Sequence, residues 1–354
     1  MPARYLLFGT ELYAVPILRP LARAARARGA VVDWLVPAPI APYLPADMHR
    51  LTRFAETVQH RYDAVFSAAN WVPPGIPGVK VQLFHGFNAE KRDPHRGHFR
   101  LRGFFDLYCT QGPATTQPFL ELSRQDRYFA VEETGWPKLD PLFYGATSPV
   151  AERLREAAAG RPCVMYASTF TESLSSAPGM LDTLEQLVAR GEWYWLLTLH
   201  PKCPHTLVQR YQRMAEAHPD HAVFMDSDHL LDMQRSADVL VCDTSSVIDE
   251  FAVQLKPVVT VKNRRPKPFM IDVQTPAEVE SAVRRALRPT PQLQAALKAH
   301  ADAIHPSRDG HASDRVLDAV ARFQAGAYGP LARKPMNLWR RWQCYRDLRA
   351  MLAS

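Results

Sequence analysis

Polar residues directly follow four apolar runs of the sequence, and their types suit the handling of an anionic substrate. The four places are His85-Gly86 after Val79–Phe84, Ser168-Thr169 after Cys163–Ala167, His200-Pro201-Lys202 after Trp193–Leu199, and Asp243-Thr244-Ser245-Ser246 after Val239–Cys242. Open parallel sheets bind their ligands at the carboxyl ends of the strands. We therefore treat these four places as the candidate functional residues.

The first candidate is His85, whose imidazole can act as a general base near neutral pH. Gly86 beside it lets the backbone come close to a ligand. We expect Gly86 and Asn88 to lie on the acceptor side of an active site, where the molecule that receives the transferred group binds. The alternative interpretation of His85 is a turn histidine that only packs.

A histidine and a lysine stand together in His200-Pro201-Lys202, where Pro201 ends the strand because it has no N–H to donate. Their positive charge suits the leaving group of a diphosphate. The alternative is a strand-capping His200 with a solvated Lys202. Ser168 and Thr169 could line a donor site in the same way, or form a simple turn.

The run from Asp243 to Ser246 is the strongest candidate for an anion site. It opens a helix expected over Ser246–Gln254, and the N–H groups and dipole of a helix start attract anions. A plain N-cap explains one hydroxyl residue, whereas three stand in a row here. Asp249 and Glu250 could bind donor hydroxyls, but for Asp249 we favour an ordinary acid in the first helical turn.

Strand and helix signals alternate along the chain and predict the elements that position these residues. Further strands are expected at Tyr5–Phe8, Val31–Val36, Ala64–Phe66, Phe104–Cys109, Tyr128–Val131, Ala222–Met225 and Pro257–Val261. Helices are expected at Val15–Arg28, His49–Gln59, Pro178–Arg190 and Thr206–His218, and the chain beyond Pro276 is expected to be helical, with interruptions. This alternation predicts two consecutive doubly wound α/β units with parallel sheets.

The chain of 354 residues is long enough for two such domains. A stretch rich in proline and glycine between Pro137 and Pro149 marks the boundary. We predict an N-terminal domain over residues 1–146, a second domain over 147–305, and C-terminal helices over 306–354 that pack on the first domain or on a membrane.

Composition and missing motifs narrow the functional classes. No apolar run is long enough to span a membrane and the start lacks a signal peptide, so we expect a cytoplasmic protein. The five cysteines have no CxxC pairing and are expected to be reduced and buried. No phosphate loop, GxGxxG, HExxH or GxSxG motif occurs, and the histidines lack metal-ligand spacing, so we expect neither a metal nor a cofactor.

Charge is concentrated at one end of the chain. The formal net charge is +7, and residues 331–354 hold six Lys or Arg against Asp347. The nearly neutral remainder argues against nucleic-acid binding. Leu338, Trp342, Tyr345 and Leu352 share one side of a helical wheel, which predicts either docking on an anionic membrane surface or packing on the first domain.

Six short motifs, taken together and in order, resemble the CDP-glycerol glycerophosphotransferase family, which includes teichoic-acid primases and polymerases. They are Phe84-His85-Gly86, Gly135 to Asp140, Tyr166 to Thr169, Thr198 to Pro201, Cys242 to Ser246 with Asp249, and Asp309 to Arg315. The sequence departs from the family pattern where Phe84 replaces Trp, Ser168 replaces Pro and Thr244 replaces Tyr. These departures bear on the identity of the donor.

The resemblance implies a GT-B fold, with two Rossmann-like domains facing a cleft, an acceptor site in the first and a CDP-glycerol site in the second. It implies transfer of glycerol phosphate to a hydroxyl of a cell-envelope polymer or of a lipid-linked or saccharide acceptor. The implied reaction releases CMP and does not require a metal. By carry-over, His85 resembles the general base, His200 the group that stabilises the diphosphate, and Ser245 and Ser246 the diphosphate binders. The donor-side set of residues is Ser168, Thr169, Lys202, Asp243, Thr244, Ser245, Ser246, Asp249 and Glu250.

Two other functions are the alternatives. A GT-B glycosyltransferase with a nucleotide-sugar donor would use the same sites for glycosidic chemistry. A protein of a different class, a catalytically silent scaffold in an envelope-polysaccharide complex, would not need both His85 and His200 at strand ends.

Overall fold

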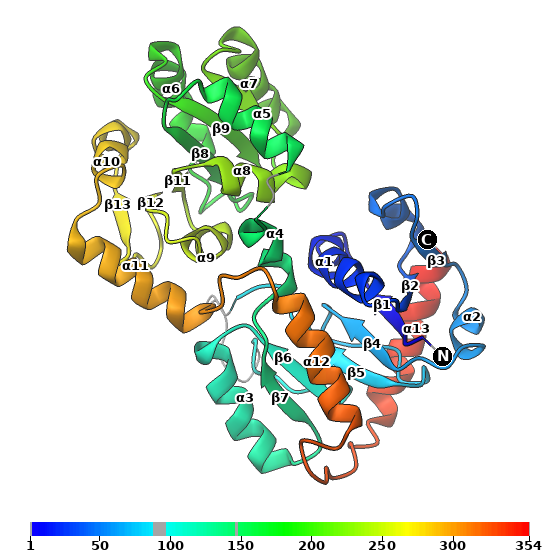
Figure 1. Ribbon diagram of the computed structural model, residues 1–354. Coiled ribbons are helices and arrows are strands. Elements are labelled where there is room, and N and C mark those ends of the chain that lie inside the picture. Colours follow the sequence, from blue (N-terminus) through cyan, green and yellow to red (C-terminus); the bar gives the residue numbers. More distant parts are fainter. Residues whose placement is uncertain (1, 88–96, 146–147, 354) are drawn as a thin grey trace. The chain divides into compact units, whose positions relative to one another are not determined.

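A computed structural model describes residues 2–87, 97–145 and 148–353 of the protein (Figure 1). The chain divides into two compact units. Unit 1 comprises Met1–Phe143 and Ile304–Ser354, and unit 2 comprises Tyr144–Ala303. The functional roles assigned to the predicted domains, and the cleft between them, stay predictions.

Unit 1 contains a seven-stranded parallel sheet in the order β3-β2-β1-β4-β5-β6-β7. Its strands are β1 (Arg4–Phe8), β2 (Val31–Leu35), β3 (His49–Leu51), β4 (Ala64–Ser67), β5 (Val79–Gln82), β6 (Leu107–Thr110) and β7 (Ala130–Glu133). The strand order reverses direction between β1 and β4. In doubly wound sheets ligands bind at such a switch point.

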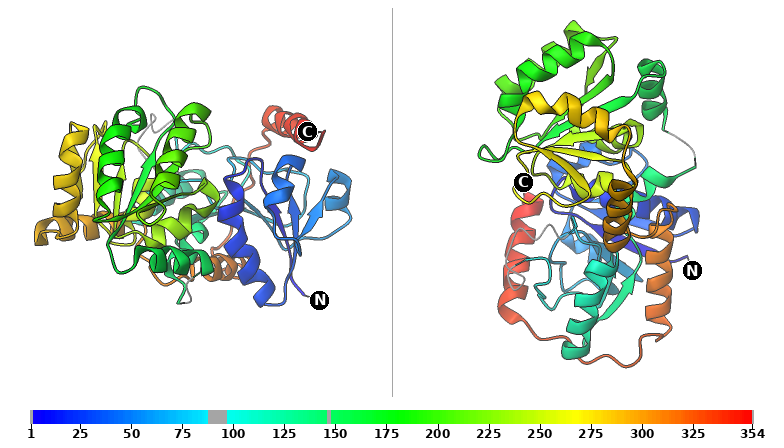
Figure 2. Two further views of the ribbon diagram at one scale, coloured as in Figure 1. Left: turned by 90° about the horizontal axis from the view of Figure 1, so that it is seen from above. Right: turned by 90° about the vertical axis from the view of Figure 1, so that its left-hand side faces the viewer.

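Helices cover both faces of this sheet, as Figures 1 and 2 show. They are α1 (Ala14–Ala27), α2 (Phe54–Val58), α3 (Pro113–Asp126), α4 (Asp140–Phe143), α12 (Ala312–Gln324) and α13 (Leu338–Ala353), with 3₁₀ turns η1 (Ala38–Tyr43) and η2 (Pro137–Leu139). Helices α1 and α12 pack together on one face. Helix α13 lies on the opposite face, where Cys344 and Leu348 join the same apolar cluster as Phe119 of α3.

Unit 2 repeats this architecture with a six-stranded parallel sheet in the order β10-β9-β8-β11-β12-β13. The strands are β8 (Cys163–Ser168), β9 (Tyr194–Leu199), β10 (Ala222–Phe224), β11 (Val239–Cys242), β12 (Val258–Val261) and β13 (Met270–Val273). Strands β8, β9, β11 and β12 are buried along their whole length, as expected for a parallel sheet with both faces covered. The switch point lies between β8 and β11.

Two helical layers bury the faces of this second sheet. The helices are α5 (Pro149–Ala158), α6 (Ala177–Arg190), α7 (His205–Ala217), α8 (Leu230–Ser236), α9 (Val247–Ala252), α10 (Val279–Ala286) and α11 (Pro291–Ile304), with 3₁₀ turns η3 (Ser227–His229) and η4 (Pro276–Glu278). One apolar cluster joins the sheet to α6, α7 and α10, and another joins it to α5, α8, α9 and α11. The predicted α/β class with two doubly wound units is confirmed.

The helix expected over His49–Gln59 is wrong in its first part. Residues His49–Leu51 form β3, which pairs with Asp33–Leu35 of β2, and α2 begins only at Phe54. The buried Asp33 carboxylate, 2.6 Å from Nδ1 of His49, helps to hold this edge strand in place. Strand β13 was not expected either, because its sequence Met-Ile-Asp-Val is too short to show a clear alternation of apolar and polar residues.

The five cysteines are all buried, as expected. Within the described parts of the chain, no helix is long and apolar enough to cross a bilayer. In those parts, no three His, Cys, Asp or Glu side chains gather in a way that could hold a metal ion.

Candidate active site

His85 is turned out of the unit 1 sheet by an unusual backbone conformation in the residue before it. Phe84 has φ of +58°, a left-handed conformation that non-glycine residues adopt rarely and at a cost of about 1 kcal/mol. The Phe84 ring is buried and packs against Phe119 and Tyr108, which holds this turn in place. The result is a buried Phe84 followed by an exposed His85.

The His85 ring lies over the switch point of unit 1. Its Nδ1 is 3.2 Å from the carbonyl oxygen of Ala68, which directly follows β4. Its ring centroid is 5.2 Å from that of Tyr13, which lies between β1 and α1. A carbonyl can only accept, so Nδ1 carries the ring proton and Nε2 is the basic nitrogen. In this tautomer Nε2 is the nitrogen that could accept a proton from an acceptor hydroxyl.

The residues after His85 are fixed from neighbouring strands. Gln111, which follows β6, donates from Nε2 to the carbonyl oxygen of Gly86 at 2.9 Å. A Cβ atom added at Gly86 would meet no atom of the described residues within 4 Å, so those residues leave room beside this backbone. The ring of Phe87 packs edge-on against Trp136 at 5.2 Å. Asn88, predicted on the acceptor side, lies outside the described residues.

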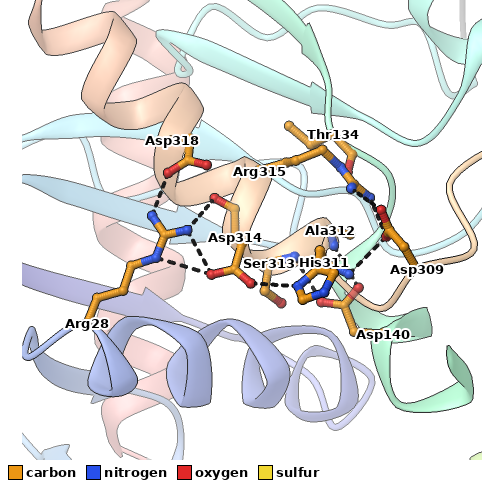
Figure 3. A network of polar contacts seen from close by, with 10 residues as sticks. All are labelled: Arg28, Thr134, Asp140, Asp309, His311, Ala312, Ser313, Asp314, Arg315 and Asp318. Atoms are coloured by element: carbon orange, nitrogen blue, oxygen red, sulfur yellow. Dashed lines mark hydrogen bonds and ion pairs between the residues drawn. The ribbon is translucent and has the colours of Figure 1, made fainter. Parts of the chain in front are cut away.

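The motifs Gly135 to Asp140 and Asp309 to Arg315 meet in a polar network in unit 1 (Figure 3). The buried Asp140 carboxylate accepts from the backbone N–H groups of Ala312 and Ser313, each at 2.8 Å, at the start of α12. Burial raises the pKa of Asp140, whereas these donors act in the opposite direction. Arg315 donates to the carbonyl oxygen of Thr134 at 2.8 Å. The two motifs thus have a shared structural role.

His305 reinforces the same junction. Its Nε2 accepts from the backbone N–H of Trp136 at 2.9 Å, and its side chain is buried. Burial, with Arg315 and Arg308 nearby, lowers the pKa of His305 to about 4, so the ring is neutral at pH 7. Because Phe87 packs on Trp136, this junction also supports the loop that carries His85.

In unit 2, Asp243 links the two strand ends at the switch point between β8 and β11. Its fully buried carboxylate accepts from Ser168 Oγ at 2.5 Å, from the Thr169 N–H at 3.0 Å and from the Ser176 N–H at 2.9 Å. Burial is the main influence on the pKa of Asp243 and raises it. Asp243 and Ser168 are thus placed to shape the loop between β8 and α6, whereas Thr169 is half-exposed beside them.

His200 and Lys202 are brought together at the end of β9, as predicted from their positions. The Lys202 N–H donates to His200 Nδ1 at 3.1 Å, so the proton of the neutral ring sits on Nε2. Burial and the neighbouring Lys202 lower the pKa of His200, which keeps the ring neutral. Phe170 supports both residues, with its ring 4.4 Å from His200 and 5.5 Å from Lys202 Nζ. This group offers an N–H donor and an ammonium to an anion.

The hydroxyl run Thr244-Ser245-Ser246 connects β11 to α9. Thr244 Oγ1 accepts from the Arg264 N–H at 3.0 Å, and Ser245 Oγ is 3.4 Å from the N–H of Val247. Ser246 is exposed and makes no side-chain capping bond. Helix α9 has only six residues rather than the expected nine. The hydroxyls of Ser245 and Ser246, more than a helix dipole, are therefore what this segment offers a ligand.

A basic loop after β12 was missed in the sequence analysis. Asn263 donates from Nδ2 to the Asp243 carbonyl oxygen at 2.9 Å, which ties the loop to the end of β11. Arg264 follows, and its side chain is exposed. The signal was available, because the polar run Lys262-Asn263-Arg264 follows the apolar run Pro257–Val261 and obeys the rule that identified the other candidates.

The two acidic residues of α9 differ in their surroundings. Asp249 lies 2.8 Å from Nε2 of His300, whose ring stacks on Phe269 at 3.9 Å. Glu250 is buried. The pairing with His300 agrees with a structural role for Asp249, and a donor contact by Glu250 stays a prediction.

A cavity lies elsewhere in unit 2. It has a volume of about 430 Å³ and is lined by residues that include Arg155 and Asp238, at the amino ends of the strands. These two side chains already pair with each other, with a nitrogen–oxygen distance of 2.8 Å. Parallel sheets bind ligands at the opposite edge, so this cavity is not the candidate donor site.

Comparison with known proteins places the chain in a family. The family model for CDP-glycerol:poly(glycerophosphate) glycerophosphotransferases matches residues 91–322, which is more than half of the chain. The chain belongs to this family, and it is therefore a transferase. This membership sets aside the alternative of a catalytically silent scaffold. No curated protein matches by sequence.

Solved structures show the same fold at low sequence identity. The wall teichoic acid polymerase TagF superposes with a TM-score of 0.67 at 16% identity, covering 92% of this chain and 90% of that one. A TagF structure soaked with CDPG gives 0.66 at 14% identity, with the same coverage. MnaA of S. aureus, solved with UDP, gives 0.61 at 12% identity, covering 91% of this chain and 97% of that one. These likenesses support the expected GT-B class of fold.

Proposed function

We propose that this protein transfers glycerol phosphate from CDP-glycerol to a hydroxyl group of an acceptor and releases CMP. The acceptor is an envelope polymer or a lipid-linked or saccharide molecule. The observation that carries the proposal is the pair of opposite histidine tautomers after the carboxyl ends of β5 and β9. His85 presents a basic Nε2, and His200 presents an Nε2–H donor. A phosphoryl transfer is assisted by a base that takes the proton of the acceptor and by a donor that stabilises the charge on the leaving group.

The acceptor half of the reaction is assigned to unit 1. Nε2 of His85 takes the proton of the acceptor hydroxyl as its oxygen attacks the β-phosphorus that bears glycerol. The Ala68 carbonyl holds the ring and stabilises the imidazolium that forms, because Nδ1–H then donates to it more strongly. Gln111 fixes the Gly86 backbone beside the attacking oxygen.

The donor half is assigned to unit 2. As the new P–O bond forms, the bond between the β-phosphorus and the bridging oxygen breaks, and CMP leaves with that electron pair. Nε2–H of His200 and the Lys202 ammonium face this developing charge in the proposed complex. Ser245, Ser246 and Arg264 would bind the diphosphate before and during transfer, on the loops that Asp243 holds in register.

We place the reaction at the inner face of the cytoplasmic membrane, where a lipid-linked or membrane-bound acceptor is presented. The concentration of positive charge in residues 331–354 supports this placement. CDP-glycerol as donor is supported by the family membership of the chain.

Titration calorimetry with CDP-glycerol, CDP, CMP, UDP and a UDP-sugar tests the donor class. We expect cytidine diphosphate compounds to bind at least tenfold more tightly than their uridine counterparts, because family membership implies a site for cytidine. A preference for uridine nucleotides, with release of UDP from a UDP-sugar, would instead favour the glycosyltransferase alternative.

A further inference from the structure

The start of helix α13 exposes a concentrated set of large apolar side chains. Met336 is 70% exposed, Leu338 and Trp339 are each 67% exposed, and Trp342 is 53% exposed. We call these four residues the tryptophan patch. Other strongly exposed large apolar side chains in the described residues are scattered over both units, whereas these four fall within seven positions. Such a concentration marks an interaction surface.

The tryptophan patch is not a loose end of the chain. Cys344 and Leu348, on the other side of α13, are buried in the core of unit 1, and Tyr345 packs edge-on against Phe54 at 6.0 Å. The structure thus divides the apolar face expected from the helical wheel. Tyr345 and Leu352 turn toward unit 1, whereas Leu338 and Trp342 do not.

The segment before α13 is also fixed. Lys334 Nζ lies 2.7 Å from a carboxylate oxygen of Asp106, and Asn337 donates from Nδ2 to the carbonyl oxygen of Arg102 at 3.0 Å. The rings of Trp339 and Trp342 stack with centroids 5.0 Å apart. A rigid support therefore presents both indole rings, so little conformational entropy is lost when they bind a partner.

The charges around the tryptophan patch are almost all positive. Arg340, Arg341, Arg346 and Arg349 lie on the same helix, and Asp347 is its one acidic residue. The Arg346 guanidinium lies over the Trp342 ring at 5.5 Å and also pairs with Asp347 at 2.8 Å. Arg341 and Arg349 are exposed and have long side chains that can reach phosphates while indole rings enter an interface.

We propose that the tryptophan patch is a membrane-docking surface that inserts Trp339, Trp342, Leu338 and Met336 at the interface of an anionic lipid bilayer. Tryptophan is suited to this interface because it has a large apolar body and one N–H donor. The arginines favour a membrane surface that carries the phosphate groups of acidic lipids, because they attract these groups. This docking surface would bring the enzyme to a lipid-bound acceptor. It rests on the proposed function only for the identity of that acceptor.

Sedimentation with lipid vesicles tests the proposal on the full-length protein. We expect binding to vesicles of phosphatidylcholine containing about one-third phosphatidylglycerol, at least tenfold weaker binding to phosphatidylcholine alone, and loss of most binding at high salt because salt screens the charges. The variant Trp339→Ser/Trp342→Ser should bind the anionic vesicles at least tenfold more weakly. Tyr43→Ser, which changes another exposed aromatic residue of unit 1, should bind normally.

A second pair of variants isolates the charge. Arg341→Gln/Arg349→Gln should bind anionic vesicles more weakly than Arg153→Gln/Arg213→Gln, which removes the same charge from exposed sites of unit 2. Indole fluorescence should shift to shorter wavelength on binding in the wild type and in Tyr43→Ser, but not in the double tryptophan variant. Equal vesicle binding by the wild type and the double tryptophan variant overturns the proposal. The proposal is also overturned if the wild type does not bind vesicles but dimerises with increasing protein concentration, and if the tryptophan substitutions abolish that dimerisation.

Transfer to a water-soluble acceptor separates this inference from the proposed function. The double tryptophan variant should retain that activity, since its substitutions lie on the surface and leave both histidines intact. Loss of vesicle binding with retained transfer supports the docking surface, whereas absence of transfer in the wild type speaks only against the proposed reaction.

Discussion

The carboxylate of Asp140 accepts a 2.8 Å hydrogen bond from the backbone N–H of Ala312, although 172 positions separate the two residues. Asp140 begins the last helix before the chain leaves unit 1, and Ala312 begins the first helix after the chain returns. This bond therefore fastens the outgoing and returning segments to each other within unit 1.

Replacing Asp140 by alanine should lower the free energy of unfolding by about 2 kcal/mol, because two N–H groups at a helix start lose their acceptor. Urea denaturation measures this loss. Asp140→Asn should lose less, since its amide oxygen can still accept. The control Asp182→Asn, at an exposed site on α6, should change little, and an equally small effect of Asp140→Ala would contradict the capping role.

Protonation of His305 should destabilise the protein in mild acid. Its folded pKa is about 4, whereas an unfolded histidine titrates near 6.5, so the stabilising contribution is present above about pH 6.5 and is lost as pH falls toward 4. Between pH 7 and pH 5 this contributes a loss of about 2 kcal/mol. Urea midpoints at both pH values should differ less in His305→Gln than in wild type or in His229→Gln. An unchanged difference in His305→Gln would show that His305 is not the responsible group.

His85→Ala should lower turnover about a hundredfold or more, which is the usual effect of removing a general base. Donor affinity should stay the same, because His85 is assigned to the acceptor half of the reaction. A CMP-release assay measures turnover, calorimetry measures binding, and His229→Ala serves as the control on the surface of unit 2. Near-normal turnover by His85→Ala would remove it from the mechanism.

The double replacement Ser245→Ala/Ser246→Ala should weaken donor binding by about 1.5 to 3 kcal/mol, since each hydroxyl is expected to bond a charged phosphate. Arg264→Ala should weaken it further, and Arg264→Lys should restore part of the affinity. Calorimetry with CDP-glycerol measures both effects, with Ser281→Ala as the control at an exposed site of α10. An unchanged dissociation constant in the double serine variant places the diphosphate elsewhere.

The positions of the candidate residues could be predicted because strand ends in parallel sheets follow from apolar runs and from the polar residues after them. His85, His200 and Ser245 all lie at such ends in the structure. The residues around them could not be predicted in the same way. Gln111 and Tyr13 reach the His85 loop from other strands, and their sequence positions give no sign of that contact.

The role of a polar residue depends on its partners, which the sequence hides. Asp243 follows a strand as a ligand-binding residue would, yet its carboxylate is occupied by Ser168, Thr169 and Ser176, the last of them 67 positions earlier in the chain. The edge strand β3 was also difficult to predict, because its three residues are too few to show a period of two.

The most direct test of the account is a transfer assay with CDP-glycerol labelled in the glycerol. We predict that wild-type protein releases CMP and moves label to a polyol-phosphate or lipid-linked acceptor in equal amounts, and that His85→Ala loses both activities together. Release of CDP instead of CMP, or wild-type protein that leaves CDP-glycerol unchanged with every such acceptor while turning over a nucleotide sugar, would contradict the central claim.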